Sequence, residues 1–199
     1  MQKILLFFVR DVVGCKMSNM KRFLIVASCL FVFVVAVAIA VSQVNFNKLR
    51  YREVNMQLPE NIKNMVVSDT RGLDAIEIAN YCNKLTCSLF SYSTSVCITP
   101  DLKDSRGHCV TYSTVCKELC NLAYKANDID ATAKVVVGQI KLANINLHNV
   151  IAAVLPDKYD RFCKDHDVVE IIHQDKSLLI DPSLTDVLWF SVRYDDSCE

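Results

Sequence analysis

One cysteine, Cys109, lies where a polar loop is followed by a predicted helix. The loop, residues 101–108, contains a single glycine, Gly107, and residues 110–126 carry apolar side chains at helical spacing. Unpaired backbone N–H groups and the positive end of the helix dipole stabilise a thiolate in the first turn of a helix and lower the thiol pKa. The sequence therefore predicts that Cys109 can act as a nucleophile; a disulfide or a buried core cysteine is the alternative.

The residues after this helix have the pattern of an antiparallel sheet. Two apolar runs are separated from a final pair of strands by a polar loop, and the last strand ends at a proline. The whole body thus predicts an α+β fold, in which a cysteine-bearing helix packs on about four antiparallel strands. The segments are a strand at 131–138, an apolar run at 147–155, a loop at 156–165, and a hairpin of 168–173 and 178–181 with its turn at 174–176.

Three segments of the body resemble the transglutaminase-like cysteine hydrolase superfamily. Residues 107–113 (GHCVTYS) resemble its GxCxxYA segment, and residues 127–138 (NDIDATAKVVVG) resemble its passage from helix to strand. Residues 166–183 (HDVVEIIHQDKSLLIDPS) are similar to its last conserved segment, with Ser177 where the family usually has Trp. The resemblance covers about residues 105–185 and implies a transglutaminase-like, papain-like domain.

The same resemblance implies a triad of Cys109 as nucleophile, a histidine as general base, and Asp181 as the group that orients the histidine. A hairpin that turns at 174–176 brings Asp181 level with residues 168–170, a short step from His166. Cross-strand neighbours lie about 4.5–5.5 Å apart, so a hydrogen bond between His166 and Asp181 is feasible. Asp181 also precedes Pro182, and the alternative is that it only initiates a turn.

His166 is the favoured histidine, and His148 stays open as an alternative. His148 begins an apolar run at a spacing from Cys109 that many members of the family show, but a meander would place the strand 168–173 between it and Asp181. We expect the side chain of His108 to diverge from that of its neighbour Cys109. His173 lies near the predicted turn and is expected at the surface.

The amino-terminal part of the chain predicts a membrane anchor. Residues 23–41 contain no charge, proline or glycine, and as a helix they would be ~28 Å long, about the thickness of the hydrocarbon core. Residues 1–42 carry five basic residues and one acidic residue, a net +4, so the other 157 residues carry 17 basic and 21 acidic residues, a net −4. Lys21 and Arg22 before the apolar run favour a cytoplasmic amino terminus. A cleaved signal peptide is the alternative, with a small-x-small site at residues 38–40.

The predicted organisation is a cytoplasmic leader at 1–22, a transmembrane anchor at 23–41, a stalk at 42–70 and a transglutaminase-like domain at 71–199. The carboxy-terminal domain would then be extracytoplasmic on a single-pass membrane protein. The stalk is predicted from its polar, initially basic composition and from Pro59.

Composition excludes several classes of protein. An apolar fraction of 52% excludes a disordered chain, and a net charge of zero excludes a basic nucleic-acid binder. The ten cysteines form no CxxC pair, so no structural metal site is expected. Nothing resembles a phosphate-binding glycine loop among only four glycines, and no cofactor is expected. Further expectations concern single side chains: Cys116 and Cys120 as small buried hydrophobic residues, Asp157, Asp160, Asp165 and Asp167 as a solvated loop, and Glu170 as a structural residue paired with a lysine on the neighbouring strand.

These patterns favour a membrane-anchored, thiol-dependent amide hydrolase or acyltransferase that acts on a peptide or protein through Cys109, His166 and Asp181. The main alternative is a catalytically inactive domain of the same fold that binds a peptide or protein at the membrane. A third possibility is a disulfide-stapled adhesion or receptor module.

Overall fold

The computed structural model describes residue 28 and residues 44–93, 106–142, 145–146, 149, 165–188 and 193–194. The predicted leader at 1–22 and anchor at 23–41 lie outside the described residues, apart from Ser28, and so do His148 and the loop 156–164. Among the described residues, no helix combines the length and the apolar character needed to cross a membrane.

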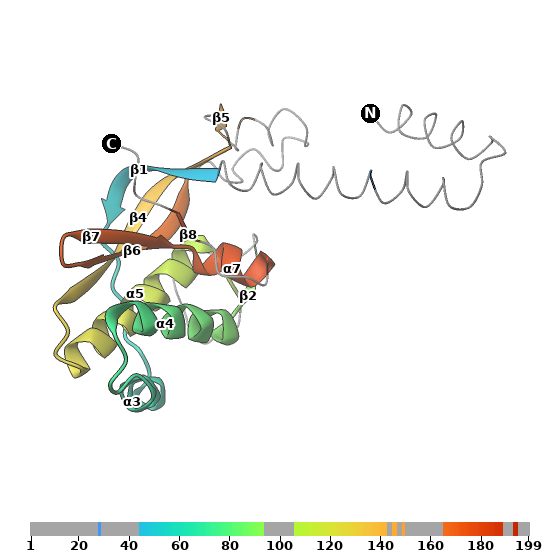
Figure 1. The fold of residues 1–199 in the computed structure, drawn as a ribbon. Helices are drawn as coiled ribbons and strands as arrows, with labels where there is room; N and C mark the ends of the chain where they lie inside the picture. The colour runs from blue at the N-terminus through green and yellow to red at the C-terminus, as the bar shows by residue number, and fades with distance from the viewer. Residues whose placement is uncertain are drawn as a thin grey trace, which may run out of the picture. The chain divides into compact units, whose positions relative to one another are not determined.

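An antiparallel sheet forms the framework of the unit from Val44 to Glu199 (Figure 1). The strand order is β1-β4-β6-β7-β8, every pair is antiparallel, and β5 extends the pairing of β4. A separate pair, β2 and β3, is parallel. The strands are β1 (Val44–Arg52), β2 (Ser91–Tyr92), β3 (Arg106–Gly107), β4 (Ala131–Leu142), β5 (Ile145–Asn146), β6 (His166–His173), β7 (Lys176–Ile180) and β8 (Arg193–Tyr194).

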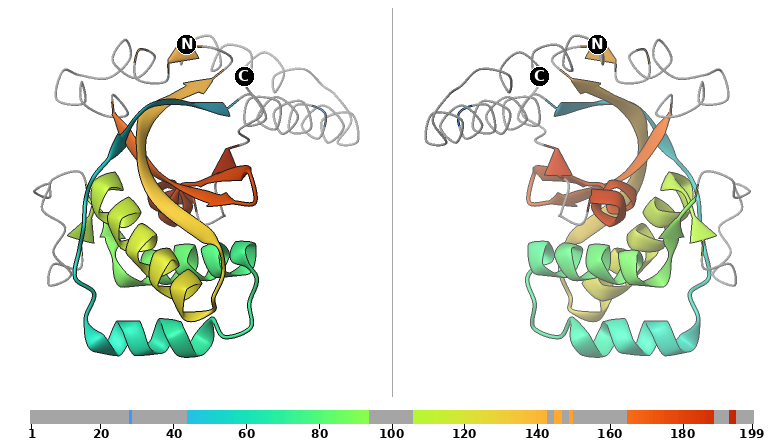
Figure 2. Two further views of the ribbon diagram at one scale, coloured as in Figure 1. Left: turned by 90° about the vertical axis from the view of Figure 1, so that its left-hand side faces the viewer. Right: turned by 90° about the vertical axis from the view of Figure 1, so that its right-hand side faces the viewer.

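Helices cover one side of this sheet, as Figure 2 shows most clearly. The helix α5 contacts β4, β6, α3, α4 and α7, so it lies at the centre of the helical layer. The helices are α3 (Glu60–Asp69), α4 (Ala75–Leu89), α5 (Cys109–Ala126) and α7 (Pro182–Leu188). The predicted α+β class, with a cysteine-bearing helix against an antiparallel sheet, is confirmed.

Neighbouring residues of the central strands belong to two different apolar clusters. Val169 and Ile180 pack in the main core with the helices, whereas Val168 and Leu179 pack in a second cluster with Val136. Because successive strand residues point to opposite faces, these strands are buried on both faces. This explains why their sequences read as continuous apolar runs rather than as an alternating pattern.

The β6–β7 hairpin is confirmed, with a two-residue turn. His173 pairs with Lys176, and both Gln174 and Asp175 have positive φ angles, 49° and 60°. Two left-handed residues are the requirement of a type I′ turn, whose twist matches that of the strands. The turn therefore fixes the register that carries Asp181 back towards the start of β6.

The segment predicted to be a stalk, 42–70, is instead largely part of the folded domain. The strand β1 pairs with β4 from Val44 opposite Leu142 to Arg52 opposite Val135, and α3 buries Ile62 in the core. Its basic residues have partners: Lys48 and Arg52 form ion pairs with acidic residues of β6. Charges typical of a solvated linker thus belong to a strand at the edge of the sheet.

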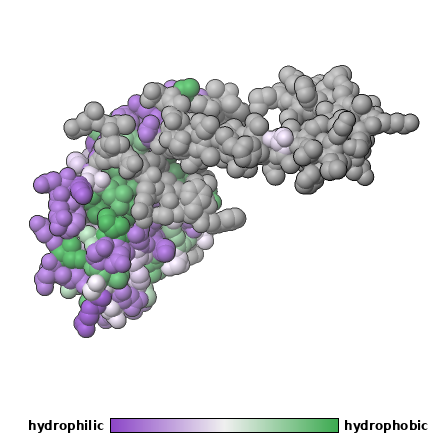
Figure 3. Space-filling view, in the orientation of Figure 1, coloured by the Kyte–Doolittle hydropathy of each residue, from purple (hydrophilic) through white to green (hydrophobic). Residues whose placement is uncertain are grey.

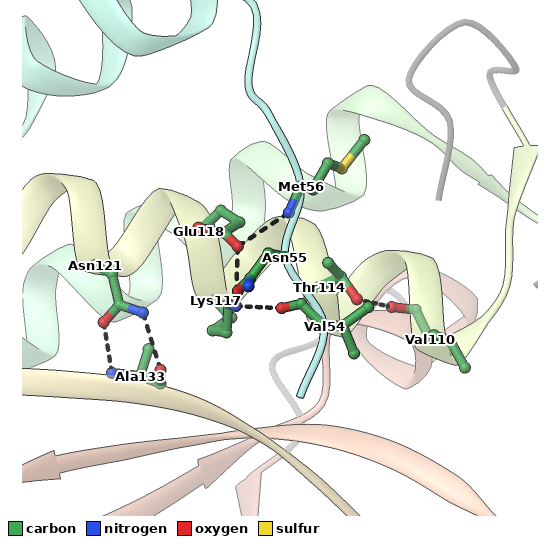
Figure 4. A network of polar contacts seen from close by, with 9 residues as sticks. All are labelled: Val54, Asn55, Met56, Val110, Thr114, Lys117, Glu118, Asn121 and Ala133. Carbon is green, nitrogen blue, oxygen red and sulfur yellow. Dashed lines mark hydrogen bonds and ion pairs between the residues drawn. The ribbon is translucent and has the colours of Figure 1, made fainter. Parts of the chain in front are cut away.

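The connection between β1 and α3 is fastened to α5 (Figure 4). The backbone N–H of Met56 donates to Glu118 Oε1 over 3.1 Å, and Lys117 Nζ donates to the carbonyl oxygen of Val54 and, over 3.1 Å, to Asn55 Oδ1. These bonds hold residues 54–56 along the helix that begins at Cys109.

A second fastening joins α5 to the sheet. The Asn121 side chain accepts from the Ala133 backbone N–H over 2.8 Å and donates to its carbonyl oxygen over 2.9 Å (Figure 4). One side-chain amide therefore satisfies both backbone groups of a β4 residue, and these two bonds hold α5 in a fixed position against β4.

Exposed large apolar side chains are scattered over the described part of the domain. Figure 3 shows hydrophilic and hydrophobic residues intermingled on the face that it presents. Single exposed apolar residues are normal on folded proteins. Among the described residues, the large ones are Leu49, Tyr51, Met65, Ile76, Ile145 and Val187.

Candidate active site

Cys109 is the first residue of α5, as the sequence predicts. The residue before it, His108, is the N-cap, and its Nδ1 accepts a hydrogen bond from the backbone N–H of Val110 over 3.1 Å. The first N–H groups of a helix have no intrahelical partner, and the helix dipole is positive at that end. The local structure therefore presents the sulfur of Cys109 where a negative charge is stabilised.

Gly107 is closely packed two residues before the nucleophile. A Cβ atom at this position would lie 3.1 Å from the Thr111 side chain and 3.2 Å from a ring carbon of Tyr112. Contacts of this length are tighter than most Cβ atoms make, so a side chain here would have to push Thr111 or Tyr112 away by a few tenths of an ångström. The glycine thus lets β3 approach the first turn of α5 closely.

His166 and Asp181 form a buried hydrogen-bonded pair. His166 begins β6, and Asp181 directly follows β7, one residue beyond the pairing of Val169 with Ile180. His166 Nε2 lies 2.5 Å from Asp181 Oδ2, and the side chains are 6% and 0% exposed. The register of the hairpin therefore brings His166 and Asp181 into the hydrogen bond that was expected from the sequence.

Asp181 also acts as a helix cap. Its Oδ1 accepts from Ser183 Oγ over 2.9 Å and from the Leu184 backbone N–H over 3.0 Å, and Pro182 occupies the first position of α7. The turn-initiating role and the contact with His166 therefore coexist, because each oxygen of the carboxyl group serves one of them. Capping holds the carboxyl group in a fixed orientation towards the imidazole.

The ionisation of the three groups is coupled. Burial alone would raise the pKa of the Cys109 thiol, but hydrogen bonds from His108 and His166, the charge of His166 and the Asp167 backbone N–H lower it to about 6. Burial would lower the pKa of His166, but Asp181 and Cys109 raise it well above its usual value. Burial would raise the pKa of Asp181, but His166 and the capping bonds lower it. At neutral pH the arrangement favours a thiolate, an imidazolium and a carboxylate.

The assignment of the ring nitrogens follows from these contacts. Nε2 of His166 faces Asp181, so Nδ1 is the nitrogen left to serve Cys109. A histidine held in this way can accept or donate a proton at the sulfur or at a group bound to it. This geometry can support nucleophilic attack by the thiolate followed by protonation of a leaving group.

Asp167 is buried at the site, which corrects the expectation of a solvated aspartate. Its side chain is 1% exposed, Arg52 Nε lies 2.6 Å from its Oδ2, and Arg52 Nη2 donates to its Oδ1 over 3.2 Å. Burial raises the pKa of Asp167, and Arg52 offsets part of that effect. The backbone of Asp167 serves the site directly: its N–H stabilises the Cys109 thiolate, and its carbonyl accepts from Ser113 Oγ over 2.7 Å.

The structure separates the four histidines. His166 contacts Asp181 and Cys109, His148 lies outside the described residues, and His173 pairs with Lys176 at the hairpin turn, at the opposite end of β6 from His166. His108 does not diverge from Cys109 as expected, because its imidazole is one of the groups that lower the thiol pKa. As the N-cap residue, His108 has its ring turned back over the first turn of the helix, where Nδ1 accepts from the Val110 backbone N–H.

Ser177, at the position where the family usually has Trp, belongs to a polar cluster away from the thiol. Its hydroxyl donates to Glu170 Oε1 over 2.5 Å, and Lys48 Nζ donates to the same oxygen over 2.7 Å. Glu170 is therefore paired with a lysine as expected, but the lysine is on β1, and β4 lies between it and β6.

The remaining described cysteines differ sharply from Cys109. Cys116 and Cys120 are fully buried, as predicted, and the hydrogen bonds of Cys120 with Cys116 and Cys82 raise its pKa. Burial and the charge of Asp186 raise the pKa of the half-buried Cys87 to about 12. Within the described ranges, no group of three or more His, Cys, Asp or Glu side chains could hold a metal ion.

No protein-family model matches the chain, and no curated protein or solved structure matches it either.

Proposed function

We propose that the domain is a transglutaminase-like, thiol-dependent amide hydrolase or acyltransferase that uses Cys109, His166 and Asp181 as its catalytic triad. The observation that carries the proposal is a thiol at the first residue of a helix, hydrogen-bonded to an imidazole whose other nitrogen lies 2.5 Å from a fully buried carboxylate. A structural cysteine needs none of these three features.

The reaction proceeds through a thioester. The Cys109 thiolate attacks the carbonyl carbon of an amide, and the C–S bond forms as the π electrons move to oxygen. The tetrahedral intermediate collapses, the C–N bond breaks, and the His166 imidazolium gives its proton to the leaving amine. Water or a second amine, deprotonated by His166, then attacks the thioester and releases the thiolate. Asp181 holds the ring and stabilises its positive charge throughout.

A peptide or protein substrate and a membrane location complete the proposal. The apolar run at residues 23–41 would anchor the chain through one helix, with the domain on the extracytoplasmic side. Nothing in the triad requires the membrane, so the two parts of the proposal can be tested separately.

Alkylation of single cysteines tests the state of the nucleophile. With pKa values of about 6 and about 12, Cys109 is mostly thiolate at pH 7 and Cys87 almost none. We expect iodoacetamide to label Cys109 more than about 100-fold faster than Cys87, measured by mass spectrometry of each cysteine. Cys87 is a matched control because it is also partly exposed. Equal rates would remove the basis for an enzyme.

Acyl transfer tests the reaction itself. Peptide amides incubated with the full-length chain and hydroxylamine are expected to give hydroxamates, since hydroxylamine captures a thioester, and Cys109→Ala is expected to give none. Omitting hydroxylamine measures hydrolysis by water. Rapid alkylation of Cys109 without hydroxamate or hydrolysis across a broad peptide set would favour the alternative, a binding domain of the same fold.

A further inference from the structure

We propose that His108 is a further catalytic residue, whose Nε2–H donates a hydrogen bond to the oxyanion formed when Cys109 attacks a carbonyl group. This inference rests on the proposed function. It assigns the donor that the triad lacks, because the three triad side chains account for the nucleophile and the proton transfers but not for the charge on the carbonyl oxygen.

The hydrogen bond at the helix cap determines which nitrogen of His108 carries the proton. Nδ1 accepts from the Val110 backbone N–H over 3.1 Å, so Nδ1 has no proton of its own. In a neutral imidazole the proton is then on Nε2. The cap thus fixes both the orientation of the ring and its tautomer.

The Nε2 atom of His108 is buried and has no nitrogen or oxygen partner among the described residues. Because Nδ1 carries no proton, the hydrogen bond from His108 that lowers the pKa of the Cys109 thiol is donated by Nε2–H. When the thiolate attacks a carbonyl group, its negative charge passes to the carbonyl oxygen, and a donor already held beside the sulfur can follow that charge.

The position of His108 places this donor at the reacting atoms. His108 is the N-cap residue directly before Cys109, and its hydrogen bond is the first of the contributions that lower the pKa of the thiol. The oxygen of a tetrahedral adduct is held on the carbon bonded to that sulfur. The Cys109 backbone N–H, in the first turn of α5, supplies one donor nearby, and His108 supplies a second.

One other buried side-chain donor near the nucleophile competes for this role. The Thr111 hydroxyl is also buried without a partner among the described residues. Thr111 follows Cys109 by two helix positions, about 200° around the helix axis, and its side chain packs towards Gly107. It therefore faces away from the sulfur, whereas His108 faces it.

Two probes of the same sulfur separate oxyanion stabilisation from thiolate stabilisation. Attack on p-nitrophenyl acetate passes through an oxyanion, forms the C–S bond of an acetyl thioester and expels p-nitrophenolate. Attack on iodoacetamide forms a C–S bond and expels iodide with no oxyanion. The rates of both reactions at Cys109 are to be measured in the full-length chain over a pH series and compared at their plateaus, where the thiolate is fully formed.

The test variants are His108→Ser and His108→Asn. Both keep a side-chain oxygen that can cap the helix, and Ser has no group that reaches as far as Nε2. We expect His108→Ser to lower the plateau rate of acetylation by roughly 100-fold or more and that of alkylation by less than about threefold. Circular dichroism and the thermal midpoint verify folding, and His108→Asn provides the same comparison if the serine variant unfolds.

Each other outcome overturns the inference. Equal losses with both probes would make His108 a thiolate-stabilising residue only, and an unchanged acetylation rate would leave it with a capping role. If wild-type Cys109 is alkylated rapidly but is not acetylated, the oxyanion donor is absent. If wild-type Cys109 reacts with neither probe faster than Cys87, the proposed function fails before the role of His108 is reached.

Discussion

The thiol of Cys109, the imidazole of His166 and the carboxyl group of Asp181 come from three elements and change one another's pKa in a chain. Asp181 raises the pKa of His166, and hydrogen bonds from His108 and His166, together with the charge of His166, lower the pKa of Cys109 to about 6 against the effect of burial. The carboxylate therefore influences the sulfur through the ring between them. Removing the charge of Asp181 should therefore raise the pKa of the Cys109 thiol.

Replacing Asp181 with asparagine tests this chain of effects. The neutral amide no longer stabilises the imidazolium, so we expect the alkylation midpoint of Cys109 to rise above about 6 and amide hydrolysis to fall at least about 100-fold. Asp165→Asn is the matched control. Asp165 directly precedes His166 in the chain, but its side chain is exposed and forms an ion pair with Arg50. The same loss in both variants would contradict a specific role for Asp181.

The stability of the Asp181 variant should depend on pH with a definite sign. The pKa of Asp181 is lower in the folded protein than in the unfolded chain, so its charge contributes stability above the unfolded value of about 4. This contribution is lost as the pH falls through the folded pKa. We expect the difference in free energy of unfolding between wild type and Asp181→Asn to be largest near neutral pH and to shrink in acid, measured by urea denaturation.

At the scale of the elements, the site depends on how α5 is held against β6. Ser113, one helical turn after Cys109, donates to the carbonyl oxygen of Asp167, the residue after His166. Arg52 from β1 binds the side chain of the same aspartate. Asp167 therefore links the helix that carries the nucleophile to the strand that carries the histidine.

Ser113→Ala should loosen this attachment. We expect a loss of about 1–3 kcal/mol from the buried carbonyl that loses its donor, together with slower alkylation of Cys109. Thr114→Ala is the control: its hydroxyl donates over the same 2.7 Å, but to Val110 within α5, whose carbonyl keeps its backbone partner. Equal effects on Cys109 reactivity would show that the link to β6 does not position the site.

The sequence was informative about elements and less so about the contacts between them. Helical spacing after Cys109 and the turn residues after His173 are local signals, and both the helix and the hairpin are where they were predicted. The burial of Asp167 could not be predicted, because it depends on Arg52, which is 115 residues earlier in the chain. The direction of the His108 ring could not be predicted either, because it depends on the hydrogen bond from the Val110 backbone N–H to Nδ1, and histidine is not among the residue types preferred at an N-cap.

At the scale of the whole molecule, residues 44–70 are the principal correction. Their polar composition predicts a stalk, yet β1 forms one edge of the sheet, and Leu58, Ile62 and Val66 are buried in the core. Arg52 and Lys48, which make the segment basic, neutralise two buried acidic residues of β6. A composition-based boundary fails here because charges paired across a sheet look the same in sequence as charges in water.

Truncation tests this boundary. Residues 44–199 are expected to unfold cooperatively, whereas residues 71–199 are not expected to fold. Burial of Leu58, Ile62 and Val66 contributes about 4.5–9 kcal/mol at about 1.5–3 kcal/mol each, comparable to the net stability of about 5–15 kcal/mol of a typical domain. Amide hydrogen exchange and urea denaturation show whether each fragment folds. A stably folded 71–199 fragment would mean that residues 44–70 are not needed for folding, as the prediction of a stalk implies.

The pH dependence of alkylation at Cys109 tests the central claim, a thiolate prepared by His166, most directly. Iodoacetamide labelling of the full-length chain between pH 4 and pH 10, with each cysteine quantified by mass spectrometry, is expected to give a midpoint near the Cys109 pKa of about 6. In His166→Ala that midpoint should move upward towards the ordinary thiol range of about 8.5. A wild-type midpoint already in that range, or one that does not change when His166 is replaced, would contradict the account.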